Sequence, residues 1–125
     1  NESYQKVGKK KPNSWGLYDM HGNVSEWTLD KHDVRSYQKY SNSVAMNPYE
    51  KPSQLYPRVV RGGSWMNSNF KLRSASRQAS SKQWKKQDPQ IPRSIWWHTD
   101  AQFVGFRIVR PLKAPKPEKQ LTYWE

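Results

Sequence analysis

The sequence contains no cysteine, which excludes disulfide bonds, thiolate metal sites and thiol nucleophiles within these 125 residues. Long apolar runs are also missing: no stretch approaches the length of a transmembrane helix, and none has the pattern of a signal peptide. Hydrophobic residues make up 34% of the chain and the mean hydropathy is −1.15, both low for a globular domain. Aliphatic residues alone would therefore give only a small core.

Aromatic residues compensate for this shortage. Seven Trp, seven Tyr and three Phe make up 14% of the chain. Each of these rings buries a large area and, in Trp and Tyr, keeps a polar group that needs a partner. We therefore expect one folded, loop-rich domain whose core is built from Trp and Tyr rather than from Leu and Ile.

The net charge of +12 is unevenly distributed. Residues 1–60 contain nine Lys or Arg against six Asp or Glu, whereas residues 61–125 contain thirteen against four. A positive field of this kind favours polyanions such as anionic glycan, anionic lipid or nucleic acid. It is also typical of a solubilising surface, and no nucleic-acid-binding motif accompanies it.

Only short segments have the periodicity of regular structure. Alternation predicts strands at Val24–Leu29, Arg58–Arg61 and, most clearly, Phe103–Val109. Residues 70–77 suit either a short helix or an extended segment, and residues 30–57 and 78–95 suit loops. Three parts follow: a basic lead-in at 1–12, a body at 13–111, and a Pro/Lys-rich tail at 112–125 that acts as linker, surface strap or partner-binding tail.

Four sequence blocks are more specific. They are NSWGLYDMHGNVSEW at 13–27, RVVRGGSW at 58–65, RSASR at 73–77 and GFR at 105–107. In this order they resemble the motifs of the formylglycine-generating-enzyme, or sulfatase-modifying-factor, family. The resemblance implies the C-terminal portion of such a domain, with an N-terminal part absent from this sequence. It implies an α+β, C-type-lectin-related fold with little regular secondary structure, and a periplasmic, extracellular or cell-surface location.

The resemblance also implies a structural Ca²⁺ site in the first block. Asp19 would provide its side chain, Met20, Gly22 and Val24 their carbonyl oxygens, and Glu26 a further carboxylate. Clustered oxygen ligands suit this hard cation. The alternative is that the two carboxylates cap loops by accepting hydrogen bonds from backbone N–H groups.

The copper site of the enzyme that names the family is not expected. Copper(I) selects soft thiolate ligands. The resemblance places Asn67 where the first thiolate belongs and the segment 70–72, which has no sulfur, where the second belongs. The sequence therefore argues against formylglycine-generating oxidase activity. An iron site is not indicated either, because His21, His32 and His98 have no ligand spacing.

Glycines and arginines in the blocks have structural interpretations. Gly62-Gly63 suits close backbone approach or positive φ. Arg61, Arg73, Arg77 and Arg107 suit pairing with carboxylates or carbonyls beneath the loops, although catalytic or anion-binding roles stay open.

We expect a non-catalytic scaffold or binding domain that presents loops to a protein or anionic glycan partner, or to an N-terminal half of the same domain. Aromatic rings flanked by cations suit such ligands, although at least one of Trp96 and Trp97 also suits the core. One alternative is a metal-dependent oxidoreductase whose site is completed by the absent part. Another is polyanion or nucleic-acid binding through the basic C-terminal half. The candidate ligand surface comprises Asn67, Trp84, Lys85, Trp96 and His98.

Overall fold

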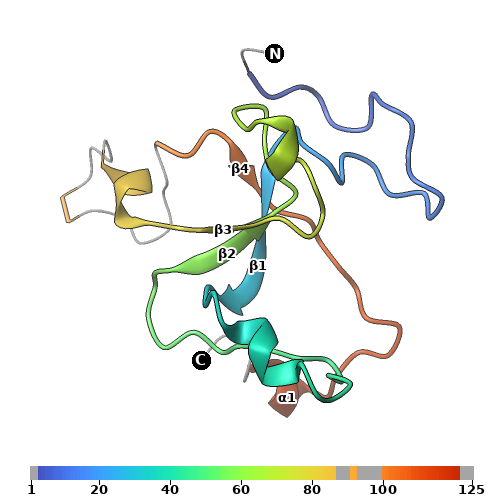
Figure 1. Ribbon diagram of the computed structural model, residues 1–125, viewed down its shortest axis with the longest axis vertical. Coiled ribbons are helices and arrows are strands. Elements are labelled where there is room, and N and C mark those ends of the chain that lie inside the picture. Colours follow the sequence, from blue (N-terminus) through green and yellow to red (C-terminus); the bar gives the residue numbers. More distant parts are fainter. Residues whose placement is uncertain (1–2, 87–90, 93–99, 122–125) are drawn as a thin grey trace.

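The computed structural model describes residues 3–86, 91–92 and 100–121. Its centre is a four-stranded mixed sheet with the strand order β3-β2-β1-β4 (Figure 1). β1 pairs antiparallel with β2, β2 antiparallel with β3, and β1 parallel with β4. The strands are β1 (Ser25–Lys31), β2 (Arg58–Arg61), β3 (Arg77–Ala79) and β4 (Val104–Gly105).

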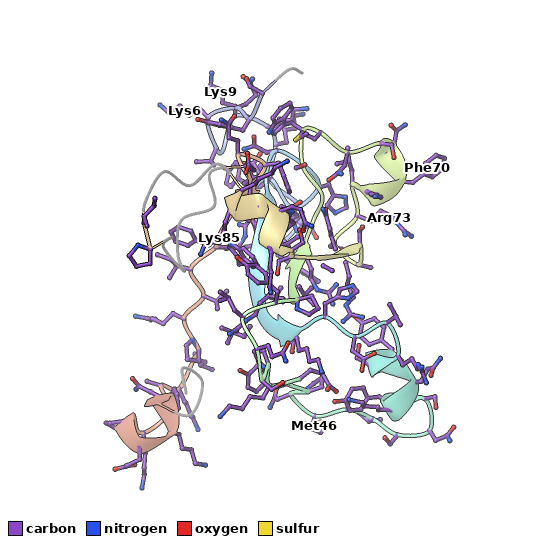
Figure 2. The ribbon with its side chains drawn as sticks, turned by 90° about the vertical axis from the view of Figure 1, so that its left-hand side faces the viewer. Lys6, Lys9, Met46, Phe70, Arg73 and Lys85 are labelled. Carbon is purple, nitrogen blue, oxygen red and sulfur yellow. The ribbon has the colours of Figure 1, made fainter. Side chains whose placement is uncertain are left out.

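Helical structure in the described chain is short. Three 3₁₀ turns, η1 (Ser36–Tyr40), η2 (Asn69–Lys71) and η3 (Lys82–Lys85), interrupt the loops between strands. One α-helix, α1 (Pro117–Leu121), lies in the C-terminal tail, and Figure 2 shows its ribbon standing apart from the sheet. Among the described residues no helix has the length and apolar character needed to span a membrane.

The core lies against the middle strands. Val59 and Val60 of β2 are almost completely buried. Trp84 packs on this strand with its ring 5.6 Å from that of Trp27 and 5.2 Å from that of Phe103. The predicted tryptophan core is therefore present, but the expected tyrosine contribution is wrong for several positions, because the tyrosines at 4, 18 and 37 are exposed. Valines of β2 fill the space instead.

Two of the three predicted strands are confirmed, with β1 shifted by one or two residues and β2 at its predicted bounds. The third is wrong beyond Gly105, because β4 holds only two residues and 106–110 have no regular structure. A strand needs a neighbour for its backbone groups. β4 is the edge of the sheet, and the described chain offers nothing beyond it.

Candidate functional site

Asparagine side chains build the loop that precedes β1. Asn13 Oδ1 accepts hydrogen bonds from the backbone N–H groups of Trp15 and Leu17, each at 3.0 Å. Asn23, in the left-handed region at φ 66°, pairs its side-chain amide with both backbone groups of Gln5. Asn favours such local bonding and tolerates positive φ. Asn13 and Asn23 of the first block therefore serve to stabilise turns.

The two carboxylates of the predicted calcium site lie in different surroundings. Asp19 Oδ2 accepts a hydrogen bond of 2.7 Å from the backbone N–H of Gly8, as the loop-capping alternative predicts. Glu26 instead accepts two bonds from the guanidinium of Arg107, at 2.7 and 2.9 Å. The same guanidinium donates to the carbonyl of Tyr18 at 2.7 Å. Arg107 therefore holds β1 to the loop that carries Asp19.

The Arg107 pair occupies one of the carboxylates that the sequence assigns to calcium. Protein Ca²⁺ sites use six to eight oxygen ligands. Glu26 has both carboxylate oxygens bonded to the guanidinium of Arg107. Met20, Gly22 and Val24 follow Asp19 in the same loop, but only Asp19 brings a carboxylate free of a cation. The calcium site stays a prediction from the sequence.

The turn after β2 comes very close to η2. Gly63 has φ +68°, and a Cβ atom built on it would lie 2.5 Å from the carbonyl oxygen of Lys71. Both reasons given for Gly62-Gly63 are thereby confirmed, since Gly62 also has positive φ. The close contact sets η2 beside the sheet and defines one wall of a cavity.

Asn67 closes the turn that follows. Its Oδ1 accepts hydrogen bonds from the backbone N–H of Ser64 at 2.9 Å and from the Ser64 hydroxyl at 3.1 Å. Its Nδ2 donates to no described residue. At the position where the resemblance places a copper ligand, this chain therefore has a side chain whose oxygen is committed to the turn.

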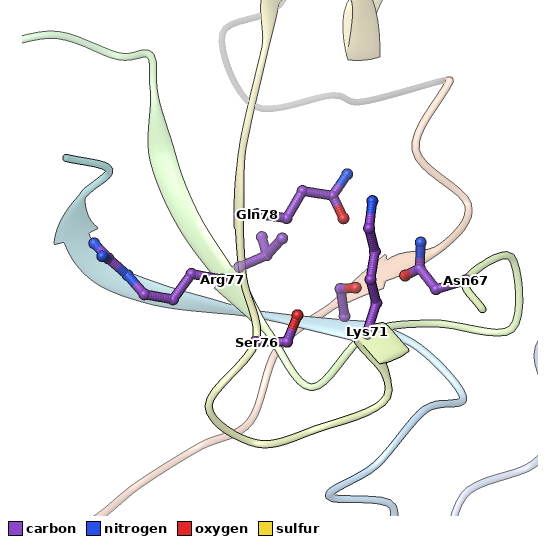
Figure 3. Close-up of a pocket in the computed structure, with 8 residues that line it drawn as sticks. Asn67, Lys71, Ser76, Arg77 and Gln78 are labelled. Carbon is purple, nitrogen blue, oxygen red and sulfur yellow. The ribbon is translucent and has the colours of Figure 1, made fainter. Parts of the chain in front are cut away.

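A cavity of about 60 Å³ lies between this turn, η2 and the strands (Figure 3). Figure 3 shows the Lys71 ammonium and the amides of Asn67 and Gln78 on one side of the strands, whereas the guanidinium of Arg77 points away. A space of this size holds several water molecules or one small polar group. The lining residues are Ser25, Val60, Gly63, Asn67, Lys71, Ser76, Arg77 and Gln78.

Polar and basic residues lie beside Val60 and Gly63 among the residues that line this cavity. No carboxylate lines it, and Lys71 provides an ammonium group. Ser25 is 1% exposed, and its hydroxyl has no hydrogen-bond partner in the described structure. A buried hydroxyl without a partner carries a desolvation cost. We call this cavity the Asn67 pocket. It is suited to a ligand group that accepts hydrogen bonds or carries a negative charge.

Four of the five arginines in the sequence blocks donate side-chain hydrogen bonds to backbone carbonyls. Arg61 bonds to Ser74 at 3.1 Å, Arg73 to Phe70 at 3.0 Å, Arg77 to Asp33 at 3.1 Å and Arg107 to Tyr18 at 2.7 Å. In Figure 2, Phe70 and Arg73 project outward from the turn that carries η2. These bonds agree with the structural interpretation of the arginines.

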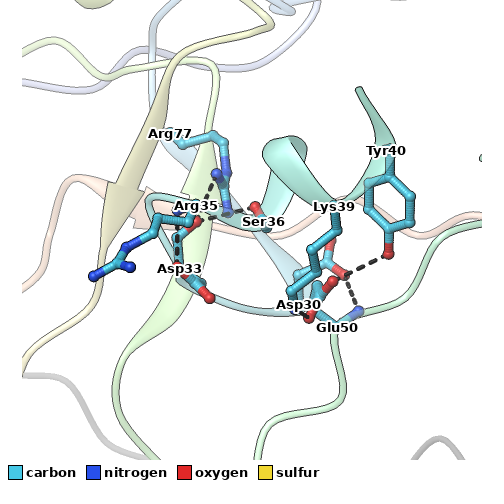
Figure 4. A network of polar contacts seen from close by, with 8 residues as sticks. All are labelled: Asp30, Asp33, Arg35, Ser36, Lys39, Tyr40, Glu50 and Arg77. Atoms are coloured by element: carbon cyan, nitrogen blue, oxygen red, sulfur yellow. Dashed lines mark hydrogen bonds and ion pairs between the residues drawn. The ribbon is translucent and has the colours of Figure 1, made fainter. Parts of the chain in front are cut away.

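A second polar cluster fastens the loop after β1 (Figure 4). Glu50 accepts hydrogen bonds from Lys39 Nζ at 2.6 Å and from the Tyr40 hydroxyl at 3.0 Å. These two donors lower the pKa of the Glu50 carboxyl. The backbone N–H of Glu50 bonds to Asp30 at 3.0 Å. Because these groups bond chiefly to one another, we infer that the cluster stabilises the loop after β1. We call it the Glu50 cluster.

The remaining candidate ligand residues are not at this site. Trp84 and Lys85 are 8% and 9% exposed, so the structure places them in the interior and not on a ligand-binding surface. Trp96 and His98 lie outside the described residues. Sequence reasoning missed Ser25, Lys71 and Gln78. Ser25 lies within the 13–27 block, and the only signal for Lys71 and Gln78 was proximity to the 73–77 block.

Comparison with known proteins relates most of the chain to one domain family. Residues 1–112 match the family described as "Sulfatase-modifying factor enzyme 1-like domain". Serine/threonine-protein kinase pkn1 of Chlamydia pneumoniae is 42% identical over 66 residues, 53% of this chain and 10% of that protein. Pkn1 of Chlamydia trachomatis is 44% identical over 64 residues, 50% of this chain and 10% of that protein. The chain thus spans about a tenth of the length of these curated relatives.

A solved structure supports the fold. PvdO from Pseudomonas aeruginosa superposes with a TM-score of 0.59 at 23% identity, covering 85% of this chain and 33% of that chain. Few helices, long loops and a mixed sheet agree with this likeness. The resemblance stated from the four sequence blocks is confirmed. This chain belongs to the family of sulfatase-modifying factor enzyme 1-like domains.

Proposed function

We propose that this chain is a non-catalytic, sulfatase-modifying-factor-like binding domain that receives an anionic group of a protein or glycan partner in the Asn67 pocket. The observation that carries the proposal is the buried Ser25 hydroxyl, which lines that pocket without a hydrogen-bond partner. The C-type-lectin relation belongs to the same proposal, since it describes a scaffold that presents loops.

The chemistry of the pocket supports an anionic ligand. Ser25, Asn67 and Lys71 line one cavity, each has a side chain that can donate a hydrogen bond, and Lys71 carries a positive charge. Hydrogen bonds between charged and polar groups are stronger than those between neutral groups. A carboxylate or sulfate group therefore suits this lining better than a neutral one.

The lack of cysteine in the sequence argues against the copper chemistry of the family and supports a binding role. Copper(I) needs thiolates, whereas Asn67 offers an amide whose oxygen already holds Ser64. The chlamydial relatives are named as kinases, and the matched segment is 10% of each. A small domain attached to a kinase suits recognition of a partner. We leave calcium out of the proposal because Arg107 neutralises Glu26.

The test is to map where small anions bind by amide chemical shifts. The probes are acetate, a peptide with a free C-terminal carboxylate and a sulfated heparin tetrasaccharide. We expect the largest shifts at Gly63, Asn67 and Gln78 for at least one probe. Shifts that are spread over the lysines of the chain and vanish with added salt would indicate nonspecific polyanion binding and contradict binding in the pocket.

A copper(I) titration tests whether this chain alone holds the metal of the family's oxidase. We expect no stoichiometric complex, because the chain has no thiolate and no cysteine. Tight one-to-one binding of copper(I) that shifts the Asn67 amide would contradict the non-catalytic proposal.

A further inference from the structure

Two arginines lie directly opposite each other on neighbouring strands. Arg61 of β2 and Arg77 of β3 are partners in the antiparallel ladder, so their side chains leave the same face of the sheet. Like charges in such a pair destabilise it. In the part of the chain that the structure describes, neither guanidinium forms an ion pair with a carboxylate. The fold therefore holds two positive charges next to each other without a balancing carboxylate.

The side chain of Tyr37 in η1 contacts both arginines. Arg61 Nη2 donates a hydrogen bond to the Tyr37 hydroxyl, and the guanidinium carbon of Arg77 lies 4.9 Å from the centre of the Tyr37 ring. Because the Tyr37 oxygen accepts the bond from Arg61, the hydroxyl keeps its own proton to donate. It donates to no described residue, and Tyr37 is 58% exposed. We call Arg61, Arg77 and Tyr37 the Tyr37 cluster.

Backbone carbonyls orient both guanidinium groups. Arg61 Nη1 donates to the carbonyl of Ser74, and Arg77 Nη1 donates to the carbonyl of Asp33, each at 3.1 Å. Figure 4 shows the Arg77 side chain directed at the loop that carries Asp33. An arginine side chain has five N–H donors. These bonds therefore fix the direction of each guanidinium and leave most of its donors for a ligand.

The positive charge of Arg77 acts on the residues around it. Asp33 gives Arg77 only its carbonyl oxygen, because its carboxylate Oδ1 accepts a hydrogen bond from the backbone N–H of Arg35 at 2.8 Å. Burial and, after it, the charge of Arg77 lower the pKa of His32. Both observations agree with a cation whose charge is not balanced by a carboxylate.

We propose that the Tyr37 cluster binds a phosphate group, as inorganic phosphate or as a phosphomonoester. A phosphomonoester carries about −1.5 to −2 charges at pH 7 and so balances two guanidinium groups, whereas a carboxylate balances one. The planar guanidinium matches two phosphate oxygens, and the Tyr37 hydroxyl provides a donor for a third. Because Tyr37 is exposed, the oxygen that carries an ester can point to solvent.

This site differs from the Asn67 pocket, and the inference does not rest on the proposed function. Arg77 is among the residues that line the pocket. In Figure 3, however, its guanidinium points away from the side chains of Lys71 and Gln78. Substitution of Lys71 therefore separates the two sites by experiment.

The experiment titrates the full chain with four probes and follows the side-chain Nε–H signals of Arg61 and Arg77 by NMR. The probes are inorganic phosphate, acetate, a capped peptide with one phosphoserine, and the same peptide without phosphate. We expect at least one phosphate probe to bind at least about fivefold more tightly than acetate, and the unphosphorylated peptide to give no shift. Tighter binding of the phosphopeptide assigns the site to phosphomonoesters, and tighter binding of inorganic phosphate assigns it to the free anion.

Matched variants locate the binding. Arg61→Gln should weaken phosphate binding about tenfold, since it removes one charge and its donors. Tyr37→Phe keeps the ring that Arg77 contacts and should weaken binding about threefold; it decides the matter if Arg61→Gln does not fold. Arg110→Gln removes the same charge from an exposed arginine in the segment after β4, and it should leave binding unchanged.

Three results would overturn the phosphate site. The first is the absence of shifts at both arginines with either phosphate probe. The second is equal weakening in Arg61→Gln and Arg110→Gln, which would indicate nonspecific attraction to the net charge. The third is a loss of phosphate binding in Lys71→Gln with none in Tyr37→Phe, which would place the anion in the Asn67 pocket.

Discussion

Arg107 and Glu26 join the two most distant sequence blocks of this domain. The guanidinium donates two hydrogen bonds to the carboxylate, at 2.7 and 2.9 Å, and both side chains are partly buried. Glu26 raises the pKa of Arg107 further above its ordinary value. Through its third bond, to Tyr18, Arg107 provides a positive charge within the block where the resemblance implied a metal ion.

Removal of Arg107 should therefore destabilise the domain. Arg107→Met leaves the partly buried Glu26 carboxylate without its partner. We expect the free energy of unfolding to fall by about 2 kcal/mol, less than for a fully buried pair because both side chains are partly exposed. Arg107→Lys should recover only part of this, because an ammonium group cannot donate in the same forked geometry. Urea unfolding gives both values. A loss below about 0.5 kcal/mol for Arg107→Met would show that the pair is not stabilising.

The same bonds predict that folding does not depend on calcium. A ligand at one hundred times its dissociation constant stabilises a protein by about 2.7 kcal/mol, which a melting curve detects readily. We expect EDTA and millimolar calcium chloride to give the same unfolding midpoint. A calcium-dependent rise that Asp19→Asn removes would restore the calcium site predicted from the sequence.

Gly63 should tolerate no side chain. In Gly63→Ala the new Cβ would lie 2.5 Å from the Lys71 carbonyl oxygen, and the residue would also be held at φ +68°. We therefore expect the free energy of unfolding to fall by about 3 kcal/mol. Gly16→Ala is the matched control, because Gly16 also has positive φ, +77°, but no atom lies within 4 Å of its added Cβ. That variant should lose only about 1 kcal/mol. Equal losses in thermal or urea unfolding would mean that the contact with Lys71 is relaxed in solution.

The Glu50 carboxyl of the Glu50 cluster should have a pKa below its ordinary value. Hydrogen bonds from Lys39 and Tyr40 lower the pKa of Glu50 from its ordinary 4.5, so the folded state binds this proton more weakly than the unfolded state. The stabilisation is complete above 4.5 and is lost as pH falls through the lowered pKa. Carboxyl NMR should give a midpoint below 4.5 that rises in Lys39→Met. A midpoint at or above 4.5 in the parent chain would contradict the bonding of Lys39 and Tyr40 to the Glu50 carboxylate.

Local sequence signals predicted the centre of the fold well. Arg58–Arg61 reads as apolar residues between charged ends, and β2 occupies those residues with Val59 and Val60 buried. Gly62-Gly63 was predicted from steric reasoning alone, and its positive φ values confirm it. Such features depend on a few neighbouring residues, so one sequence is enough to find them.

Features that depend on distant partners were harder to predict. Alternation from Phe103 to Val109 is that of a strand, but a strand also needs a neighbour, and β4 ends at Gly105. Trp84 and Lys85 look like a surface motif because one tryptophan lies among three lysines there, yet both are buried. Nothing in the sequence separates a ring on a surface from a ring against Trp27. The Asn67 pocket likewise forms from three strands and η2.

The most direct test of the binding proposal compares the acetate dissociation constants of the parent chain, Lys71→Gln and Lys113→Gln from the shift of the Gln78 amide. Lys71 lines the Asn67 pocket, whereas Lys113 lies exposed in the tail, so the two variants remove the same charge from different places. The account predicts binding about tenfold weaker in Lys71→Gln and unchanged in Lys113→Gln. Equal weakening in both variants, or no shift at Gln78 in the parent chain, would contradict it.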